Sequence, residues 1–365
     1  MVVQFTPFAV FSLSHLFNME ITVSILLGIG ILIGLAGLYL LFVALVPGIT
    51  APVLHLEKAK QPFMDVDAKT SRSRKDVSFN VKGTSIRAWL YLPENSTTAV
   101  PCIIMGHGFG GTRDMGLERY AVRYLAAGYA VLIFDYRYFG ASGGQPRQLI
   151  WFPYQLEDWQ AAINYARSLK EIDASKIALW GTSASGGHVI VSAAKDRNIA
   201  CVSAQCPGLD GRASAMMALK KEGLNFRLIV HAQRDLVRSW LGLSPHKIPI
   251  VGKPGSIACI TTSDAYDGYS KFASENFINE TCARIAIRAD KYRPVKHAGS
   301  VSCPVLLQIC EHDSITPKSA AEETEKKLGN FAEVKYYPIG HFDIYFGDHF
   351  ERSIGDQLEF FKKNL

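Results

Sequence analysis

Three side chains of this chain have the types and the order that acyl transfer through a serine requires. Ser183 lies in the small-residue turn Gly-Thr-Ser-Ala-Ser-Gly-Gly, which follows an apolar run at residues 176–180. A serine hydroxyl is a poor nucleophile until a neutral histidine takes its proton, and a carboxylate must orient that histidine and stabilise the imidazolium. Asp313 and His341 follow in the order serine, acid, histidine, and each comes after a strand-like run. The sequence therefore predicts Ser183 as the nucleophile, Asp313 as the acid and His341 as the base.

A second serine, two residues further along, competes for the role of nucleophile. With Ser183 at the centre of the turn, Gly181 precedes it and Ser185 follows; with Ser185 at the centre, Ser183 precedes it and Gly187 follows. The apolar run ends at residue 180, so Ser183 falls in the turn itself, and Ser185 falls in the first turn of the helix. Only the former lies beside a free backbone N–H, that of Ala184, which could hold an oxyanion. We therefore expect the nucleophile at Ser183.

The acid also has two candidates. Asp210 follows a strand expected at residues 200–205, and Asp313 follows one expected at 304–310. The position at a strand end and the order along the chain favour Asp313, with Asp210 as the alternative.

A glycine-rich stretch could hold the negative charge that develops on a substrate. His107-Gly-Phe-Gly-Gly directly follows an apolar run at residues 101–105. Glycines let the backbone approach a reacting carbonyl group, so we expect the N–H groups of Phe109 and Ala184 to form an oxyanion hole. His107 is interpreted as a structural hydrogen-bonding residue. The aromatic residues Tyr138 and Trp240 are candidates for lining a substrate pocket.

These residues need a scaffold in which several strands end at one edge, and the remaining sequence predicts such a scaffold. From residue 76 onward, short β-branched runs alternate with helical stretches, which is typical of a mostly parallel sheet covered on both faces. The fold class is therefore a doubly wound α/β sheet. Strands are expected at 77–81, 86–92, 101–105, 130–134, 176–180, 200–205, 304–310 and 334–337, and helices at 117–127, 155–168, 186–195, 318–328 and 353–363.

The alternation stops between residues 211 and 300, a stretch too long for a loop within a compact domain. We interpret it as a cap inserted after the sixth strand, over the edge of the sheet where open α/β folds bind ligands. The expected organisation is an N-terminal segment at 1–20, a membrane anchor at 21–46, a linker at 47–75, a core at 76–210 and 301–365, and the cap at 211–300.

The combination of Ser183, Asp313, His341 and the glycine-rich loop that begins at His107 resembles the α/β-hydrolase superfamily, over residues 76–365. The stretch FDYRYFGASGG is similar to a loop of the serine-aminopeptidase-like and X-Pro-dipeptidyl-peptidase-like branches. The stretches GTSASGGH and GHFDIY are similar to polyketide-transesterase-like hydrolases. The resemblance implies a serine hydrolase that needs no cofactor. We expect it to cleave a carboxylic ester, or a thioester or amide, of a small acyl substrate, with an aminopeptidase-type enzyme or a catalytically silent ligand-binding protein as alternatives.

An apolar segment precedes this region. Residues 21–46 contain no Asp, Glu, Lys or Arg, and Glu20 is the only formally charged side chain before residue 57. At about 1.5 Å per residue, a helix of this length exceeds the ~30 Å hydrocarbon core of a bilayer. A cleaved signal peptide has a positive n-region and a shorter apolar stretch. The segment therefore predicts a single-pass transmembrane helix in contact with membrane lipid.

The charges around this segment suggest its orientation. Lys58 and Lys60 follow it, whereas no Lys or Arg precedes it, so the positive-inside rule places the large C-terminal part in the cytoplasm. Two Asn-x-Ser/Thr sequons, at Asn95 and Asn279, would suit the opposite side. A Gly-xxx-Gly pattern at residues 30–34 could let two such helices pack closely, so a homodimer is possible.

Composition excludes other classes of protein. The net charge is +6, and about half of this excess lies in residues 57–75, so no basic face with interleaved aromatic residues remains for nucleic acid. The seven Cys residues show neither a CxxC pair nor the Cys/His spacing of a zinc site. No metal or nucleotide is therefore expected.

Overall fold

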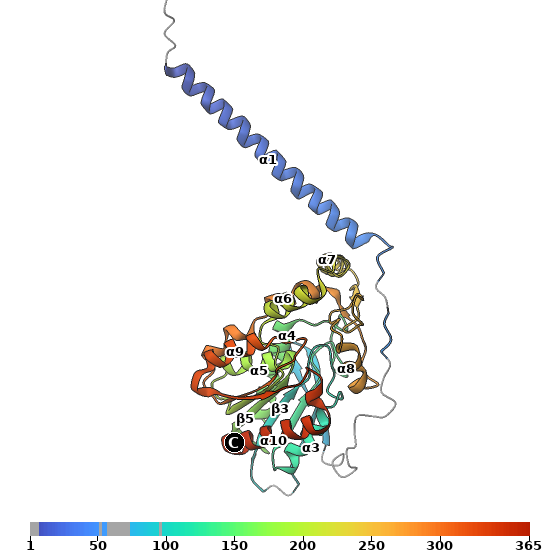
Figure 1. The fold of residues 1–365 in the computed structure, drawn as a ribbon, viewed down its shortest axis with the longest axis vertical. Helices are drawn as coiled ribbons and strands as arrows, with labels where there is room; N and C mark the ends of the chain where they lie inside the picture. Colours follow the sequence, from blue (N-terminus) through green and yellow to red (C-terminus); the bar gives the residue numbers. More distant parts are fainter. Residues whose placement is uncertain (1–6, 51–52, 57–73, 95–96) are drawn as a thin grey trace, which may run out of the picture.

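The computed structural model describes residues 7–50, 53–56, 74–94 and 97–365, which form a long N-terminal helix and an α/β domain (Figure 1). The linker expected at 47–75, with Lys58 and Lys60, lies largely outside the described residues, as does Asn95. The domain is built on one eight-stranded sheet with the strand order β1-β2-β4-β3-β5-β6-β9-β10. The strands are β1 Arg74–Val81, β2 Thr84–Tyr91, β3 Val100–Gly106, β4 Ala130–Phe134, β5 Ile172–Thr182, β6 Cys201–Gln205, β9 Val305–Cys310 and β10 Ala332–Tyr337.

The sheet is parallel from β4 to β10, and β2 pairs antiparallel with both of its neighbours, β1 and β4. Strand β3 pairs with both β4 and β5, so the chain order reverses beside β3. At such a reversal, the loops that follow the two neighbouring parallel strands lead away in opposite directions. A crevice forms between these loops at the carboxyl edge of the sheet, and open α/β folds bind ligands there. The predicted fold class, a doubly wound and mostly parallel α/β sheet, is confirmed.

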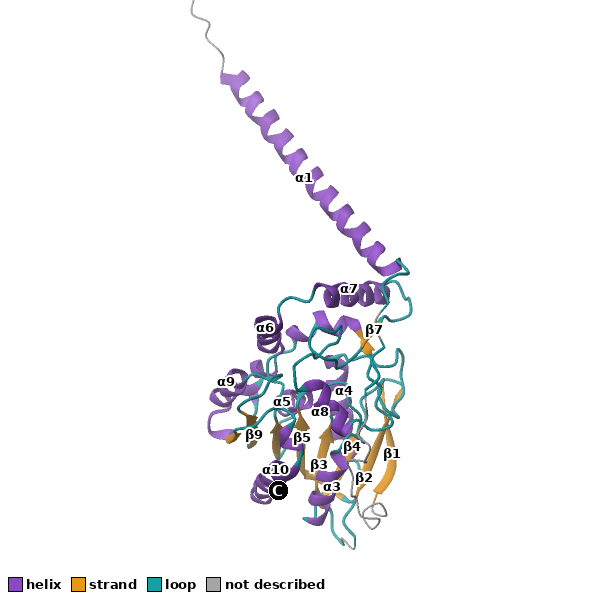
Figure 2. Cartoon of the chain, turned by 45° about the vertical axis from the view of Figure 1, so that its right-hand side comes forward, coloured by secondary structure: helices purple, strands orange, loops and turns teal. Residues whose placement is uncertain are grey.

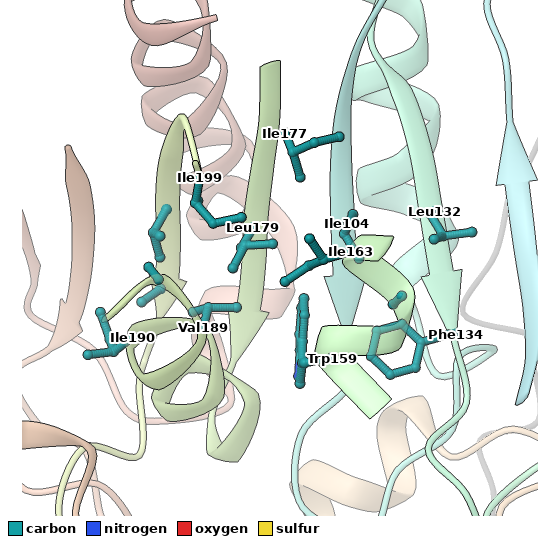
Figure 3. Close-up of a cluster of buried hydrophobic side chains, with 14 of the residues drawn as sticks. Ile104, Leu132, Phe134, Trp159, Ile163, Ile177, Leu179, Val189, Ile190 and Ile199 are labelled. Carbon is teal, nitrogen blue, oxygen red and sulfur yellow. The ribbon is translucent and has the colours of Figure 1, made fainter. Parts of the chain in front are cut away.

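Helices cover both faces of the sheet because successive side chains of each buried strand point to opposite faces. One face packs against α4 Phe152–Arg167, α5 Ala184–Lys195 and α9 Lys318–Leu328. Figure 3 shows this cluster, in which Ile104 and Leu179 of the sheet face Ile163 of α4. The opposite face packs against α3 Leu117–Ala126 and α10 Gly347–Asn364.

Residues 211–300 lie between β6 and β9 and contain short elements of their own. These are α6 Gly211–Glu222, α7 Phe226–Trp240, β7 Lys247–Ile248, α8 Ala265–Phe272 and β8 Thr281–Cys282, followed by the 3₁₀ helices η1 Ala283–Ile287, η2 Ala289–Lys291, η3 Pro294–Lys296 and η4 Ala298–Ser300. Two further 3₁₀ turns, η5 Gly329–Phe331 and η6 Asp343–Tyr345, belong to the core. A buried carboxylate, Asp235 of α7, ties the segment together, because it accepts hydrogen bonds from the Arg284 side chain and from the backbone of His246. Figure 2 shows α6 and α7 at the end of the domain nearest to the N-terminal helix.

The N-terminal helix, α1, runs from Pro7 to Leu45, and its part from Met19 to Leu45 is long and apolar enough to cross a bilayer. This span of 27 residues has a mean hydropathy of 2.6, and none of its most apolar stretch is buried against the domain. Within residues 19–45, where burial is described, Val43 and Ala44 of the last turn are buried, and the end of the helix packs on α7. The helix is a candidate for a membrane anchor or a signal sequence.

Candidate active site

Ser183 stands at the turn between β5 and α5 in a backbone conformation that side chains rarely adopt, with φ 54° and ψ −122°. The small residues around it make this turn possible. A Cβ atom on Gly181 would lie 2.3 Å from the carbonyl oxygen of Ser185, and one on Gly108 would lie 3.2 Å from Cβ of Ser183. Backbone strain of this kind collects at functional sites, where the surrounding packing maintains it. The turn holds the Ser183 side chain clear of the sheet.

The loops after β9 and β10 bring Asp313 and His341 to the same place. Nε2 of His341 lies 3.2 Å from Oγ of Ser183, and Nδ1 of His341 lies 2.6 Å from Oδ2 of Asp313. When the imidazole of His341 is neutral and donates from Nδ1–H to this carboxylate, Nε2 is left as an acceptor for the serine hydroxyl. The structure therefore joins the three side chains into one hydrogen-bonded chain.

Asp313 is itself held in place. Its Oδ1 accepts hydrogen bonds from the backbone N–H groups of Ile315 and Thr316, at 2.8 and 2.7 Å, and its Oδ2 accepts one from the Thr316 hydroxyl at 2.7 Å. These donors fix the plane of the carboxylate, so its lone pair points at the imidazole.

Burial and neighbouring charges have opposite effects on the pKa values of Asp313 and His341. Burial alone raises the pKa of Asp313, but the adjacent His341 and the donors from Thr316 more than offset it, and the net pKa is lowered. Burial likewise lowers the pKa of His341, yet the nearby acidic groups outweigh it, Asp313 first and then Cys206 and Asp264, and they raise that pKa to about 9. Asp313 is therefore ionised at neutral pH and favours the imidazolium form of His341.

The loop after β3 lies against Ser183 on the other side. Tyr269 of α8 donates a hydrogen bond from its hydroxyl to the carbonyl oxygen of Phe109, at 2.8 Å, and this contact fixes the peptide next to the Phe109 N–H. As the first residue of α5, Ala184 has a backbone N–H that no earlier turn of the helix accepts. His107 is buried, its Nδ1 lies 3.0 Å from the Gly108 carbonyl oxygen, and burial lowers its pKa to about 4.

The two alternative residues have other contacts. The hydroxyl of Ser185 is buried on α5 and lies 2.7 Å from the hydroxyl of Tyr136, away from His341. Asp210 caps the N-terminus of α6 by accepting from two backbone N–H groups, and it forms an ion pair with Arg293 at 2.6 Å. Neither residue belongs to the hydrogen-bonded chain of Ser183.

A pocket opens at Ser183 and His341. Most of its other lining residues are apolar or aromatic: Phe109, Met115, Leu117, Tyr120, Tyr269, Phe272, Phe342 and Tyr345. Tyr138 and Trp240 are not among the lining residues. Tyr138 packs beside Tyr154, and Trp240 lies at the end of α7 with 63% of its surface exposed. For Trp240 the reason is the path of the 211–300 segment, which brings α8 over the site and leaves α7 outside it.

Of the two pocket residues of α8, Tyr269 is one of the aromatic residues of the inserted segment that the sequence offers for a pocket, and Phe272 is the one that sequence reasoning missed. Gly268 was the available signal, because a Cβ atom at this position would lie 2.3 Å from the ring of Phe342, the residue after His341. A glycine in the middle of a short helix marks a close approach of this kind. Within the described ranges, no group of three or more His, Cys, Asp or Glu side chains could hold a metal ion.

Comparison with known proteins places this site among hydrolases. Residues 82–224 match the family model of the X-Pro dipeptidyl-peptidases, the S15 family. The chain is 42% identical over 295 residues to the quorum-quenching protein AidA of Acinetobacter baumannii, covering 79% of this chain and 94% of that protein. It is 25% identical to the thiohydrolase aneE of Aspergillus aculeatus, covering 77% of this chain and 90% of that one.

The solved structures agree on the fold. The α/β hydrolase GrgF from Penicillium sp. sh18 superposes with a TM-score of 0.68 at 23% identity, over 80% of this chain and 98% of that chain.

Proposed function

Because this chain belongs to the α/β-hydrolase superfamily, within the group that includes AidA, we propose that it is a serine hydrolase that cleaves a carboxylic ester or thioester through an acyl-Ser183 intermediate. The observation that carries the proposal is the position of His341, which lies within hydrogen-bond distance of Ser183 on one side and of Asp313 on the other. The relatives of this chain support the general proposal that it is a hydrolase. The serine mechanism rests on the geometry of this chain's own residues.

In the first half of the proposed reaction, Oγ of Ser183 attacks the acyl carbon while its proton passes to Nε2 of His341. The N–H groups of Phe109 and Ala184 hold the oxygen that becomes negative. The bond from the acyl carbon to the leaving oxygen or sulfur then breaks, and the proton on His341 passes to that atom. The acyl group remains on Ser183 as an ester.

In the second half, a water molecule gives a proton to Nε2 of His341, and its oxygen attacks the acyl carbon of the intermediate. The same two N–H groups stabilise the second oxyanion. The bond to Oγ of Ser183 breaks, the serine recovers the proton from His341, and the carboxylic acid is released. Asp313 remains ionised throughout and stabilises the imidazolium that forms in each half.

The pocket favours an apolar acyl group over a peptide. Its lining contains Met115, Leu117, Phe272 and Phe342 but no Asp or Glu that could pair with the free amino group of a peptide substrate. A thiohydrolase among the relatives supports a thioester as one form of the substrate. Ester and thioester cleavage are therefore preferred to aminopeptidase activity.

We also propose that α1 is retained as a membrane anchor. The guanidinium groups of Arg234 and Arg238 donate hydrogen bonds to the carbonyl oxygens of Val43 and Ala44 in its last turn. Removal of the helix as a signal sequence would abolish these contacts. The side chain of Asn279 donates to the carbonyl oxygen of Val251 and accepts from its N–H, which leaves no free amide for glycosylation and agrees with a cytoplasmic domain.

The test is a substrate screen on the full-length protein in detergent. Acyl esters of graded chain length, thioesters with the same acyl groups and aminoacyl anilides are compared for the wild type and Ser183→Ala. We expect turnover of esters and thioesters, and a loss on the order of a millionfold in the variant if the chemical step is limiting. Faster hydrolysis of the anilides would indicate an aminopeptidase, and no turnover by folded protein would indicate a silent binding protein.

A further inference from the structure

Exposed apolar side chains gather on one part of the domain. Outside α1, twelve large apolar side chains are exposed among the described residues, and seven of them lie between residues 216 and 243. We call this region, which comprises α6, α7 and the turns after them, the α6–α7 face. Its exposed apolar residues are Met216, Leu219, Leu224, Phe226, Trp240, Leu241 and Leu243. Helix α6 has no buried residue at all.

This face adjoins the point where α1 meets the domain. Arg234 donates to the carbonyl oxygen of Val43 at 2.6 Å, Arg238 donates to that of Ala44 at 3.1 Å, and the hydroxyl of Tyr39 donates to Gln233 at 2.9 Å. The last carbonyl groups of a membrane helix need such donors because lipid supplies none. Figures 1 and 2 show α7 beside the C-terminal end of α1. If α1 crosses a bilayer, α7 therefore lies where the helix leaves the apolar layer.

The exposed aromatic residues of α7 point to the side that α1 contacts. At 100° per residue, Phe226, Gln233 and Trp240 lie within about 40° of one another around the helix axis. Gln233 is bonded to α1, and Phe226 and Trp240 lie beyond it toward the two ends of α7, exposed by 70% and 63%. The side of α7 that carries Gln233, one of its three bonded contacts with α1, thus also carries two aromatic side chains that no part of the described domain covers.

The charges of the face are mostly positive. Arg212, Lys220, Lys221 and Arg227 are exposed, whereas the two acidic residues of this stretch are already engaged. Glu222 accepts a hydrogen bond from Thr261, and buried Asp235 is paired with Arg284. An apolar surface with a tryptophan at its edge and a basic rim matches the interface of an anionic bilayer, where tryptophan and basic side chains concentrate.

We infer that the α6–α7 face binds the anionic surface of the bilayer that α1 crosses, with Phe226, Trp240 and their apolar neighbours in the interface and Lys220 and Lys221 against the lipid phosphates. The inference rests on the proposed anchoring by α1 and goes beyond it, because a helical tether alone would leave the domain free to turn away from the lipid. Docking fixes the orientation of the domain.

Tryptophan fluorescence of the full-length protein in lipid vesicles tests the inference. The chain has five Trp residues and none lies in α1, so the anchor itself contributes no signal. Phosphatidylcholine with bromine on the acyl chain, mixed with phosphatidylglycerol, should quench roughly a fifth of the emission, the share of one tryptophan at the interface. Trp240→Phe should abolish the quenching, and Trp151→Phe, a matched control at a half-buried tryptophan outside this face, should retain it.

The role of charge is tested with a pair of matched variants. The double change Lys220→Glu and Lys221→Glu should lower the quenching at least twofold in vesicles with phosphatidylglycerol. The corresponding change of Lys326 and Lys327, a basic pair at the end of α9, should leave it unchanged. Equal quenching in both double variants would overturn the electrostatic part of the inference.

Flotation of the same vesicles separates a failure of docking from a failure of anchoring. Protein that floats with the vesicles but shows no quenching of Trp240 overturns the docking and leaves the anchor intact. Protein that does not float overturns both. A dimer in detergent whose Trp240 is shielded from iodide would show that a second copy of the chain, rather than lipid, covers this face.

Discussion

Replacing Asp313 by asparagine tests how the site prepares its base. In the wild type, the carboxylate of Asp313 lies 2.6 Å from Nδ1 of His341 and is the largest of the influences that together raise the histidine pKa from 6.5 to about 9 against the effect of burial. At 1.36 kcal/mol per unit, this amounts to roughly 3 kcal/mol of preference for the imidazolium. The reaction passes through that imidazolium, so the same interaction stabilises the transition state.

The Asp313→Asn variant should lose this stabilisation and also the correct tautomer. The amide side chain keeps an oxygen for the donors of Ile315 and Thr316, and its NH₂ group then faces Nδ1 of His341. Nδ1 becomes the acceptor, the proton moves to Nε2, and the base can no longer accept from Ser183. We expect kcat to fall about 10⁴-fold, the loss typical of this change in a serine triad.

The assay is kcat/KM on an activated ester from about pH 5 to 10. Only neutral His341 can take the serine proton, so activity is lost as the pH falls through its pKa, and the acid limb of the wild type should lie above 6.5, toward 9. In Asp313→Asn the carboxylate is absent, so burial has the larger effect and lowers the pKa of His341. The acid limb of the activity that remains in this variant should therefore move to lower pH.

Asp210→Asn is the matched control. It removes a carboxylate that follows the neighbouring strand and is paired with Arg293, so it should change the stability of the protein but leave the pH profile of activity in place. Our reasoning is refuted if Asp313→Asn retains turnover within tenfold of the wild type, or if Asp210→Asn, and not Asp313→Asn, shifts the acid limb.

Three further changes probe the surroundings of the nucleophile. Ser185→Ala should keep most of the turnover and cost about 1 kcal/mol of stability for the lost hydrogen bond, measured by urea unfolding alongside the ester assay; a dead but folded variant would contradict this. Tyr269→Phe removes the hydrogen bond to the carbonyl oxygen of Phe109. It should lower kcat about tenfold with little change in KM, as expected for an interaction that stabilises the transition state. A change in KM alone would indicate a role in substrate binding. Phe272→Ala enlarges the pocket and should shift preference toward longer acyl chains in a panel of esters, whereas Trp240→Ala should leave that preference unchanged; the reverse pattern would mean that α7 contacts the substrate.

The strands and the placement of Ser183, Asp313 and His341 after them could be predicted from the sequence because local patterns determine them. Each of the eight expected strands is present, and β4 and α9 have the expected limits, since buried runs and turn residues mark their ends. Gly181 and the apolar run before it locate the turn at Ser183, and the position of the His341 loop after the last strand follows from the fold class.

The pocket lining could not be predicted in the same way. Trp240 was chosen because it is aromatic and lies in the inserted segment, but which residues of that segment face the site depends on its path in three dimensions. The path is set by distant contacts, such as the bond from Tyr269 to Phe109 and the packing of Gly268 on Phe342. No local period in the sequence records these contacts.

Covalent labelling with a fluorophosphonate tests the central claim most directly. The reagent reacts with a serine only when a base activates it and nearby donors stabilise the negative charge that develops, which is the arrangement that we propose for Ser183. Mass spectrometry of the digested full-length protein should place a single adduct on Ser183, and Ser183→Ala should abolish it. An adduct on Ser185, or no adduct on protein whose fold is intact, would contradict the account.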